Sequence, residues 1–197
     1  MKNYFHNIKK IIKIILFSKW VFLPPPKKKI LIIDFENPFN KYFNNNDINF
    51  LYRRGEEINL FVLFQCLLSF KLSTLGYYQR YIDFAKPKII LTVPDNYPSF
   101  FQLSRLTKIK TAFIQKGKRT RSDGIFSQKE IANKKNKKKY FVDYMFVHNK
   151  YVAKIYNSFI DGKTIEIGSF RNNIINKIKT KKKEILFIST YKPKSFR

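Results

Sequence analysis

Short apolar runs of the chain end repeatedly in polar residues that could bind a ligand. The runs at 30–33, 89–93, 111–114 and 164–167 are typical of buried strands. The polar residues or glycines that follow them are Asp34, Asp95, Asn96, Gln115, Gly117, Gly168 and Ser169. In a parallel sheet the carboxyl ends of the strands share one edge, where ligands bind. The sequence therefore predicts that these residues line one cleft.

The same residues also have purely structural interpretations, which stay open. Asp34 and Asp95 could each cap a turn or a helix start. Gly117 and Gly168 could be present because the backbone needs a positive φ.

No motif assigns a catalytic residue or a metal site. Asp34 is not followed by a glycine-rich phosphate loop, and the chain has neither a nucleophile elbow nor a paired histidine and carboxylate. Cys66 is the one cysteine and lies in an apolar run, so we expect it to pack in the core. His6 and His148 are far apart and lack metal-ligand spacing, so no metal is predicted.

Strands and helices alternate along the chain. Strands are expected at 30–33, 48–52, 89–93, 111–114, 142–147 and 164–167, and helices at 58–68, 77–85, 100–106 and 149–159. Residues 36–47 and 116–139 are polar and predicted to be loops, and helix 58–68 is apolar enough to be buried. The alternation predicts an α/β fold, namely a Rossmann-like parallel sheet with helices on both faces.

The two ends of the chain predict a division into three parts. Residues 1–22 are predicted to form a basic amphipathic helix, and Pro24 to Pro26 follow as a stiff spacer, so 1–26 is one unit. Residues 27–180 form the Rossmann-like domain. Lys181 to Lys183 precede the apolar run 185–189, which is expected to begin a truncated second domain over 181–197.

The N-terminal segment also bears on location. Lysines interrupt its apolar run, so it fits neither a signal peptide nor a membrane-spanning helix. We expect a cytoplasmic protein, peripheral to the inner membrane, with residues 1–22 either on an anionic membrane surface or packed on the domain.

The charge of the chain suggests a polyanionic partner. Forty basic and 13 acidic residues give a formal net charge of +27. An AT-rich genome would also enrich lysine, asparagine and isoleucine without selection for charge. Arginine, the better reader of phosphate and guanine, is scarce, which argues against nucleic acid as the partner. A basic nucleic-acid-binding or peripheral membrane-binding module without catalysis is the alternative function.

Five short stretches of the chain form a recognisable set. They are Lys86-Pro-Lys-Ile-Ile-Leu-Thr, Asp95-Asn96 before Phe100-Phe101, Phe113-Ile-Gln-Lys-Gly-Lys-Arg119, Val142-Asp-Tyr-Met-Phe-Val and Ile167-Gly-Ser-Phe-Arg-Asn-Asn173. Together they resemble bacterial surface carbohydrate biosynthesis proteins of GT-B type, and more distantly CDP-glycerol glycerophosphotransferases. They occur in the expected order over residues 28–197.

The resemblance implies the acceptor-binding, N-terminal half of a glycosyltransferase or polyol-phosphate transferase of lipopolysaccharide biosynthesis. Its substrate would be a sugar or polyol phosphate, with a nucleotide-activated donor as second substrate and no cofactor. A second domain or a downstream polypeptide would complete the cleft. The substrate-binding residues carried over are Asp95, Asn96, Gln115, Gly117, Arg119, Gly168, Ser169 and Asn172.

The chain departs from the family pattern at two points. Lys116 stands where the family's loop usually carries asparagine, and the histidine that the glycerophosphotransferases carry near this loop is missing from it. The general base is therefore unassigned.

Overall fold

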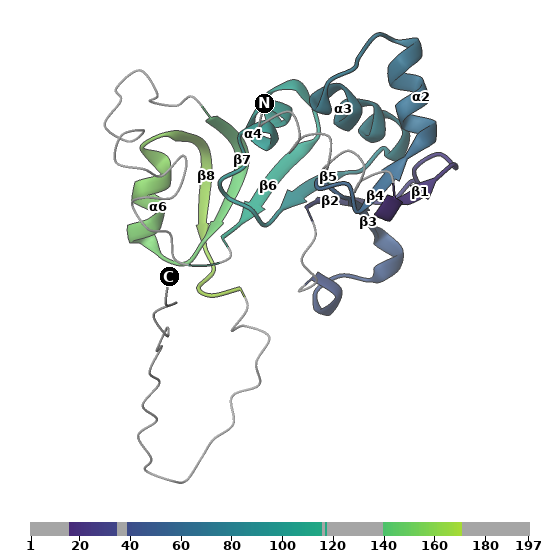
Figure 1. The fold of residues 1–197 in the computed structure, drawn as a ribbon. Coiled ribbons are helices and arrows are strands. Elements are labelled where there is room, and N and C mark those ends of the chain that lie inside the picture. Colours follow the sequence, from purple (N-terminus) through teal and green to yellow (C-terminus); the bar gives the residue numbers. More distant parts are fainter. Residues whose placement is uncertain (1–15, 35–38, 116, 118–139, 171–197) are drawn as a thin grey trace, which may run out of the picture.

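A six-stranded parallel sheet is the centre of the protein (Figure 1). The computed structural model describes residues 16–34, 39–115, 117 and 140–170. Within these residues the strand order is β3-β2-β5-β6-β7-β8, and every neighbouring pair is parallel. The bounds are β2 (Ile30–Ile33), β3 (Ile48–Leu51), β5 (Ile89–Thr92), β6 (Lys110–Ile114), β7 (Tyr140–Val147) and β8 (Ile160–Glu166). The predicted Rossmann-like α/β fold is confirmed.

Alternating side chains of the strands pack into two apolar layers. On one face, Leu31 and Ile33 lie in the larger core together with the helices α2 (Leu60–Leu68), α3 (Thr74–Ala85), α4 (Pro98–Leu106) and α6 (Lys150–Asn157). On the other face, Ile32 packs with Phe39 and Phe170. In the described ranges the second face is covered by the 3-10 helix η1 (Phe39–Lys41) and the segment after β8, and η2 (Asn45–Asp47) precedes β3.

The strand order places a topological switch point between β2 and β5. The chain passes from β2 to β3 on the face of η1, and from β3 to β5 on the face of α2 and α3. The segments that leave β2 and β5 therefore diverge. In open α/β sheets the carboxyl ends at such a point form the usual ligand crevice.

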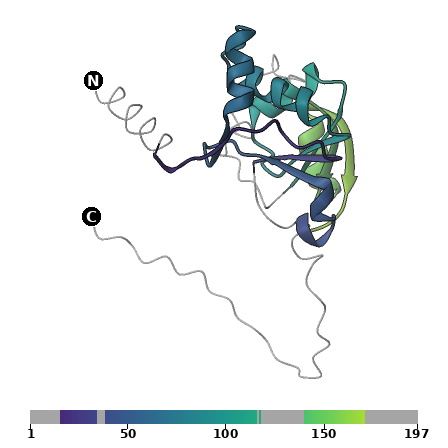
Figure 2. The ribbon, with the colours of Figure 1, turned by 90° about the vertical axis from the view of Figure 1, so that its right-hand side faces the viewer.

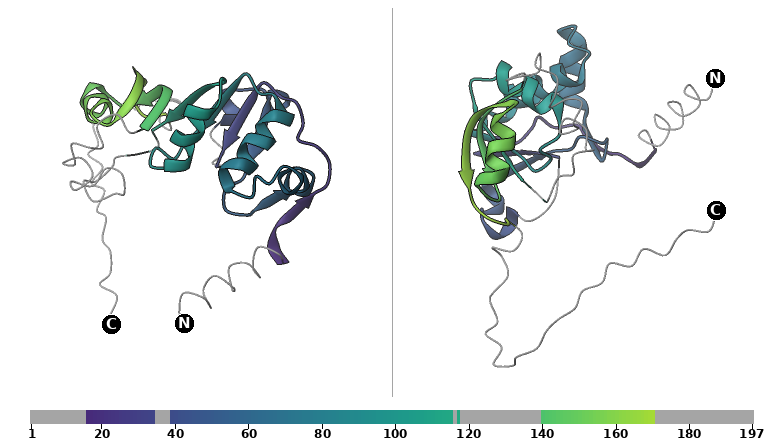
Figure 3. Two further views of the ribbon diagram at one scale, coloured as in Figure 1. Left: turned by 90° about the horizontal axis from the view of Figure 1, so that it is seen from above. Right: turned by 90° about the vertical axis from the view of Figure 1, so that its left-hand side faces the viewer.

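The N-terminal segment forms a small second sheet and not a continuous helix. β1 (Lys19–Val21) pairs in parallel with β4 (Glu57–Asn59), and the Lys19 Nζ lies 2.9 Å from the Glu57 Oε2. The helix predicted over 1–22 therefore cannot extend beyond Ser18, because Lys19 to Val21 exchange backbone hydrogen bonds with β4. Residues 1–15 lie outside the described part of the chain, and Figures 2 and 3 show the dark-purple segment extending away from the large sheet.

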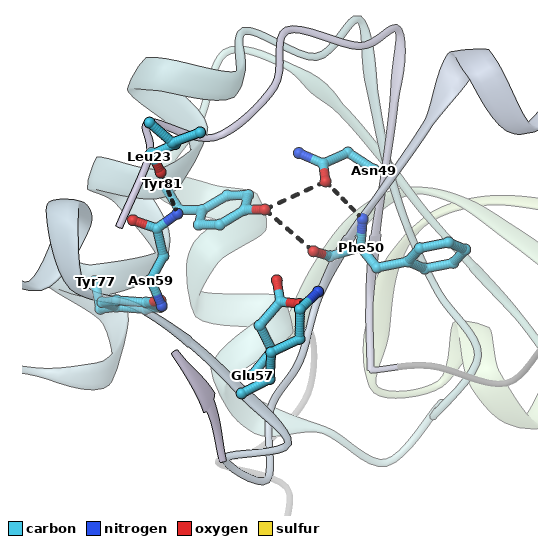
Figure 4. Close-up of polar contacts among 8 residues, drawn as sticks. Leu23, Asn49, Phe50, Glu57, Asn59, Tyr77 and Tyr81 are labelled. Carbon is cyan, nitrogen blue, oxygen red and sulfur yellow. Dashed lines mark hydrogen bonds and ion pairs between the residues drawn. The ribbon is translucent and has the colours of Figure 1, made fainter. Parts of the chain in front are cut away.

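Buried amides and tyrosines fix this small sheet to the body (Figure 4). The Asn59 Nδ2 donates to the Leu23 carbonyl, and the Asn59 N–H donates to the Tyr77 hydroxyl, both at 2.9 Å. The Tyr81 hydroxyl lies 3.1 Å from the Phe50 carbonyl. Burial raises the pKa of Tyr77 to about 12 and that of Tyr81 further, so both hydroxyls stay protonated.

Helix α2 is less buried than its composition predicts. The helix begins at Leu60, because Asn59 accepts a hydrogen bond from the Val62 N–H as the N-cap, and Ile58 belongs to β4. Val62 and Cys66 are buried, whereas the outward side chains are exposed. The prediction of a buried helix over 58–68 is wrong, since α2 contacts the body along one stripe only. The expected core position of Cys66 is confirmed.

Several other boundaries differ from the predicted ones. Helix α3 begins at Thr74 and not at 77, and α4 begins at Pro98 and not at 100. Strand β8 begins at Ile160 and not at 164, and α6 ends at Asn157 and not at 159. Gly162 has φ +150° and lies where the pairing of β8 with β7 shifts its register. The glycine allows this irregularity, so β8 can begin at Ile160. The region expected to be loop at 36–47 contains η1 and η2.

Candidate functional site

Asp34 lies at the switch point in an unusual backbone conformation. It follows β2 directly, has φ +62° and is buried. Its N–H donates to the Leu51 carbonyl at 3.0 Å, and its Oδ2 lies 2.9 Å from the Arg53 Nη2. Aspartate tolerates the left-handed region better than most residues, so the turn and the ion pair are compatible. The predicted turn position of Asp34 thus also provides the counter-ion of Arg53.

Arg53 connects Asp34 to two tyrosines. Its guanidinium carbon is 4.4 Å from the centroid of the Tyr97 ring, and the Tyr97 hydroxyl is 2.7 Å from that of Tyr78. Burial, followed by the hydrogen bond between Tyr78 and Tyr97, raises the pKa of Tyr78 well above its usual range. Because Tyr97 immediately precedes α4, this switch-point cluster of Asp34, Arg53, Tyr78 and Tyr97 brings together segments that follow β3 and β5.

A cavity of about 750 Å³ adjoins the switch-point cluster. It extends from the residues after β3 to the turn between α2 and α3, and both Arg53 and Tyr78 belong to its lining. Other lining residues are Trp20, Arg54, Glu57, Leu63, Lys71 and Leu72. The lining combines three cationic side chains with apolar surface.

A second polar group lies at the carboxyl ends of β6 and β7. The Gln115 Oε1 accepts from the His148 N–H, and the Gln115 Nε2 donates to the Gly117 carbonyl, both at 3.0 Å. The Gln115 N–H also donates to the Phe146 carbonyl at 2.9 Å. Gln115 therefore fixes the positions of the residues around it. We call Gln115, Gly117 and His148 the histidine cluster.

The imidazole of His148 has an unusual environment. Its Nε2 is buried and has no hydrogen-bond partner among the residues that the structure describes. Native proteins pair most buried polar atoms, so an unpaired nitrogen needs an explanation. A neutral imidazole with a free Nε2 could accept a proton or a hydrogen bond from a ligand.

Asp95 lies within the core at the end of β5. It is fully buried, and the Tyr156 hydroxyl donates to its Oδ2 at 2.5 Å. Tyr156 in turn packs on Phe113 of β6 with ring centroids 5.5 Å apart. The carboxylate therefore joins the loop after β5 to α6. Asn96 beside it is half-buried in a turn.

The remaining predicted residues follow β8 or lie outside the description. Gly168 has φ +71°, as its structural interpretation expects, and Ser169 is half-buried next to it. Phe170 then packs on Tyr42, whose hydroxyl donates to the Phe170 carbonyl at 3.1 Å. Arg119 and Asn172 lie outside the described residues, as does the run 185–189.

Sequence reasoning missed three residues of this edge: Arg53, Tyr97 and His148. A signal existed for two of them, since Arg53 follows strand β3 and His148 follows strand β7 by the same rule that selected Asp34. His148 lies next to Gln115 in space, although 33 residues separate the two in the sequence.

A match to a family model connects this edge to a biological process. Residues 112–197 match the model of a family described as "putative O-antigen biosynthesis protein". The matched segment links the chain to surface carbohydrate biosynthesis. It includes the histidine cluster and Gly168, and it says nothing of a GT-B architecture or of glycerophosphotransfer. Comparisons with curated proteins and with solved structures give no match.

A metal site and a membrane-spanning helix each place requirements on the described part of the chain. In the described ranges, no group of three or more His, Cys, Asp or Glu side chains is arranged to bind an ion. Nor is any helix there long and apolar enough to cross a membrane. What the described edge offers is a cation beside aromatic rings at one end and a histidine at the other.

Proposed function

We propose that the chain is a transferase of surface polysaccharide or lipopolysaccharide biosynthesis, acting on a sugar or polyol phosphate. In this proposal it forms the acceptor-binding half of a GT-B-type cleft, in the cytoplasm and next to the inner membrane. A nucleotide-activated sugar or polyol is the donor, and a second domain or polypeptide provides the opposite wall. The family match and the polar carboxyl edge support this assignment.

The observation that carries the proposal is the unpaired, buried Nε2 of His148 beside Gln115. Both residues belong to the segment that matches the family model. In the proposed reaction an acceptor hydroxyl oxygen forms a bond to the donor's sugar carbon or phosphorus. The bond to the nucleotide phosphate breaks, the nucleotide keeps the electron pair, and His148 Nε2 takes the hydroxyl proton.

The other residues would then bind the substrate or hold His148 in position. Gln115 holds the backbone of His148, so it is a positioning residue. Asn96, Gly117, Arg119, Gly168, Ser169 and Asn172 remain proposed substrate-binding positions, and Asp95 would act through the loop that it fixes to Tyr156. Because Nε2 is covered in this structure, substrate binding is expected to include a local opening.

Transfer can be tested with the full chain together with the partner polypeptide, meaning the downstream polypeptide that would supply the opposite wall of the cleft. The chain is incubated with phosphorylated sugars or glycerol phosphate as acceptors and with a panel of nucleotide-activated sugars and CDP-glycerol. Nucleotide release is measured by ion-exchange chromatography. We expect release that depends on the acceptor, and a rate at least about 100-fold lower for His148→Gln.

The matched control is Lys150→Ala, since Lys150 is exposed two residues away and should leave the rate unchanged. Full activity of His148→Gln would exclude the imidazole as proton acceptor. Failure of every donor, with the partner polypeptide present, would overturn the transferase assignment itself.

A further inference from the structure

The outward face of α2 and the turn after it are apolar and exposed. Val62 and Cys66 face the body, and Gln65 is the one polar side chain within the helix. Phe64 has 57% and Phe70 has 90% of its surface accessible. Single exposed apolar residues are ordinary, but a contiguous set marks an interaction site. The exposed members here are Leu63, Phe64, Leu67, Leu68, Phe70 and Leu72.

The strand β1 region extends the same surface. Leu16, Phe17, Phe22 and Leu23 are also exposed. β1 pairs with β4, which runs directly into α2, and Trp20 shares the cavity lining with Leu63 and Leu72. Figures 1 and 3 show β1 and α2 together at one end of the molecule, away from α6 and β8. We call these ten exposed residues the apolar rim.

Cationic side chains line the cavity that the apolar rim borders. Arg53, Arg54 and Lys71 are in the lining, and Glu57 is the one acid there. The Glu57 carboxylate pairs with Lys19, and the Asp34 carboxylate lies 2.9 Å from the Arg53 guanidinium and 3.8 Å from that of Arg54. Arg54 keeps 68% of its side chain exposed, and Lys71 is exposed as well. The three cations of the lining therefore outnumber the carboxylates that face them, Glu57 and Asp34, and the cavity carries an excess of positive charge within apolar surroundings.

We propose that this end of the molecule docks on a bilayer and that the cavity binds the phosphate of an anionic phospholipid. Arg54 and Lys71 face the phosphate, and the apolar rim inserts among the acyl chains. A surface that is apolar with cationic side chains beside it is what an anionic membrane interface selects. A second copy of the chain fits less well, because a net charge of +27 repels another copy.

The inference extends beyond residues 1–22, for which the sequence left membrane contact and packing on the domain as alternatives, and it is independent of the transferase proposal. Vesicle binding needs no turnover, so either proposal can fail while the other survives.

The test is co-sedimentation of the full chain with vesicles of phosphatidylcholine, either alone or mixed with about 30% phosphatidylglycerol, which gives the vesicles an anionic surface. We expect strong binding to the anionic vesicles only. Arg54→Ala/Lys71→Ala should weaken it about 30-fold, from two lost charges near the surface. Phe64→Ser/Leu68→Ser should weaken it at least about 10-fold. All four side chains are exposed, so a urea unfolding curve is expected to remain unchanged.

Matched controls come from the other end of the molecule. Lys150→Ala/Lys154→Ala removes two exposed charges, and Leu106→Ser/Tyr151→Ser removes two exposed apolar groups. Both should bind as the unchanged chain does. If the controls weaken binding as much as the test variants, the docking surface is wrong.

Two further outcomes would also overturn the proposal. Displacement from vesicles by millimolar glycerol phosphate would mean that the cavity takes a free phosphate ester. A dimer in sedimentation velocity that Phe64→Ser/Leu68→Ser abolishes, without vesicle binding, would assign the apolar rim to self-association.

Discussion

The carboxyl edge of the sheet is built in two different ways at its two ends. The switch-point cluster is charged, with the buried Asp34 paired to Arg53 and an aromatic ring stacked on the cation. The histidine cluster is held by hydrogen bonds between uncharged groups, in which the Gln115 side-chain amide joins the backbones of Gly117 and His148. One end is thus organised by an ion pair beside a cavity, the other by amide hydrogen bonds that leave an imidazole nitrogen unpaired.

This difference separates binding from chemistry. Cations and aromatic rings beside a cavity are suited to holding an anionic, partly apolar ligand. A buried nitrogen without a partner is suited to exchanging a proton. The two clusters would therefore respond differently to substitution, and three variants compare how each end is held together.

The largest effect is expected at Gly162, in the strand that flanks the histidine cluster. A Cβ at this position would lie 1.9 Å from the Val142 carbonyl oxygen, and the φ of +150° is strained for any other residue. Gly162→Ala should therefore lower the free energy of unfolding by more than about 3 kcal/mol, measured by urea denaturation.

Gly117→Ala is the control within the histidine cluster itself. A Cβ at Gly117 would have no neighbour within 4 Å, so we expect little change in stability. Equal stability of Gly162→Ala and the unchanged chain would mean that β8 can move away from β7 without cost.

The sequence predicts the framework of this edge well and its contacts poorly. The β-branched run of β2 and the apolar runs of β5, β6 and β7 identify the strands, because burial on both faces leaves a continuous apolar signal. Strands β1 and β4 are three residues each, and polar residues interrupt them, Lys19 in β1 and both ends of β4, so they carry no such signal.

The site depends on pairings that single positions do not reveal. Gln115 is visible as a residue after a strand, but its contact with His148 depends on the register of β6 against β7. Asp95 is visible for the same reason, yet its burial against Tyr156 follows from the packing of α6. Likewise, the apolar composition of α2 indicates a helix, but its position at the end of the molecule leaves its outer face exposed.

A smaller effect is expected from removing the charge at the switch point. Asp34→Asn keeps a residue that tolerates φ +62° but leaves Arg53 without its partially buried counter-ion. We expect a loss of about 2 kcal/mol in the free energy of unfolding. Asp47→Asn is the control, because its pair with Lys29 is also 2.9 Å long but more exposed, and should cost under about 0.5 kcal/mol. Similar losses for both variants would remove the contrast between a buried and a surface pair.

The smallest effect on stability is expected at Asp143. This residue of β7 contacts β6 through its carboxylate, away from the carboxyl ends of the two strands. Burial opposes its ionisation, but the Lys110 ammonium and the Thr111 N–H and hydroxyl outweigh burial and lower the pKa of Asp143. A carboxyl group with a lowered pKa stabilises the fold above its ordinary pKa of 3.8, and this contribution disappears as the pH falls through the lowered value.

Asp143→Asn should therefore cost about 1 kcal/mol at pH 7 and progressively less below pH ~4 in urea unfolding. The N–H and hydroxyl donors of Thr111 can still reach the amide oxygen, which limits the loss to the charged part of the interaction. A difference between the two proteins that stays constant from pH 7 into the acid range would show that charge contributes nothing here. The strand pair next to the histidine cluster would then be held by neutral hydrogen bonds along its whole length, and the contrast with the switch-point cluster would become sharper.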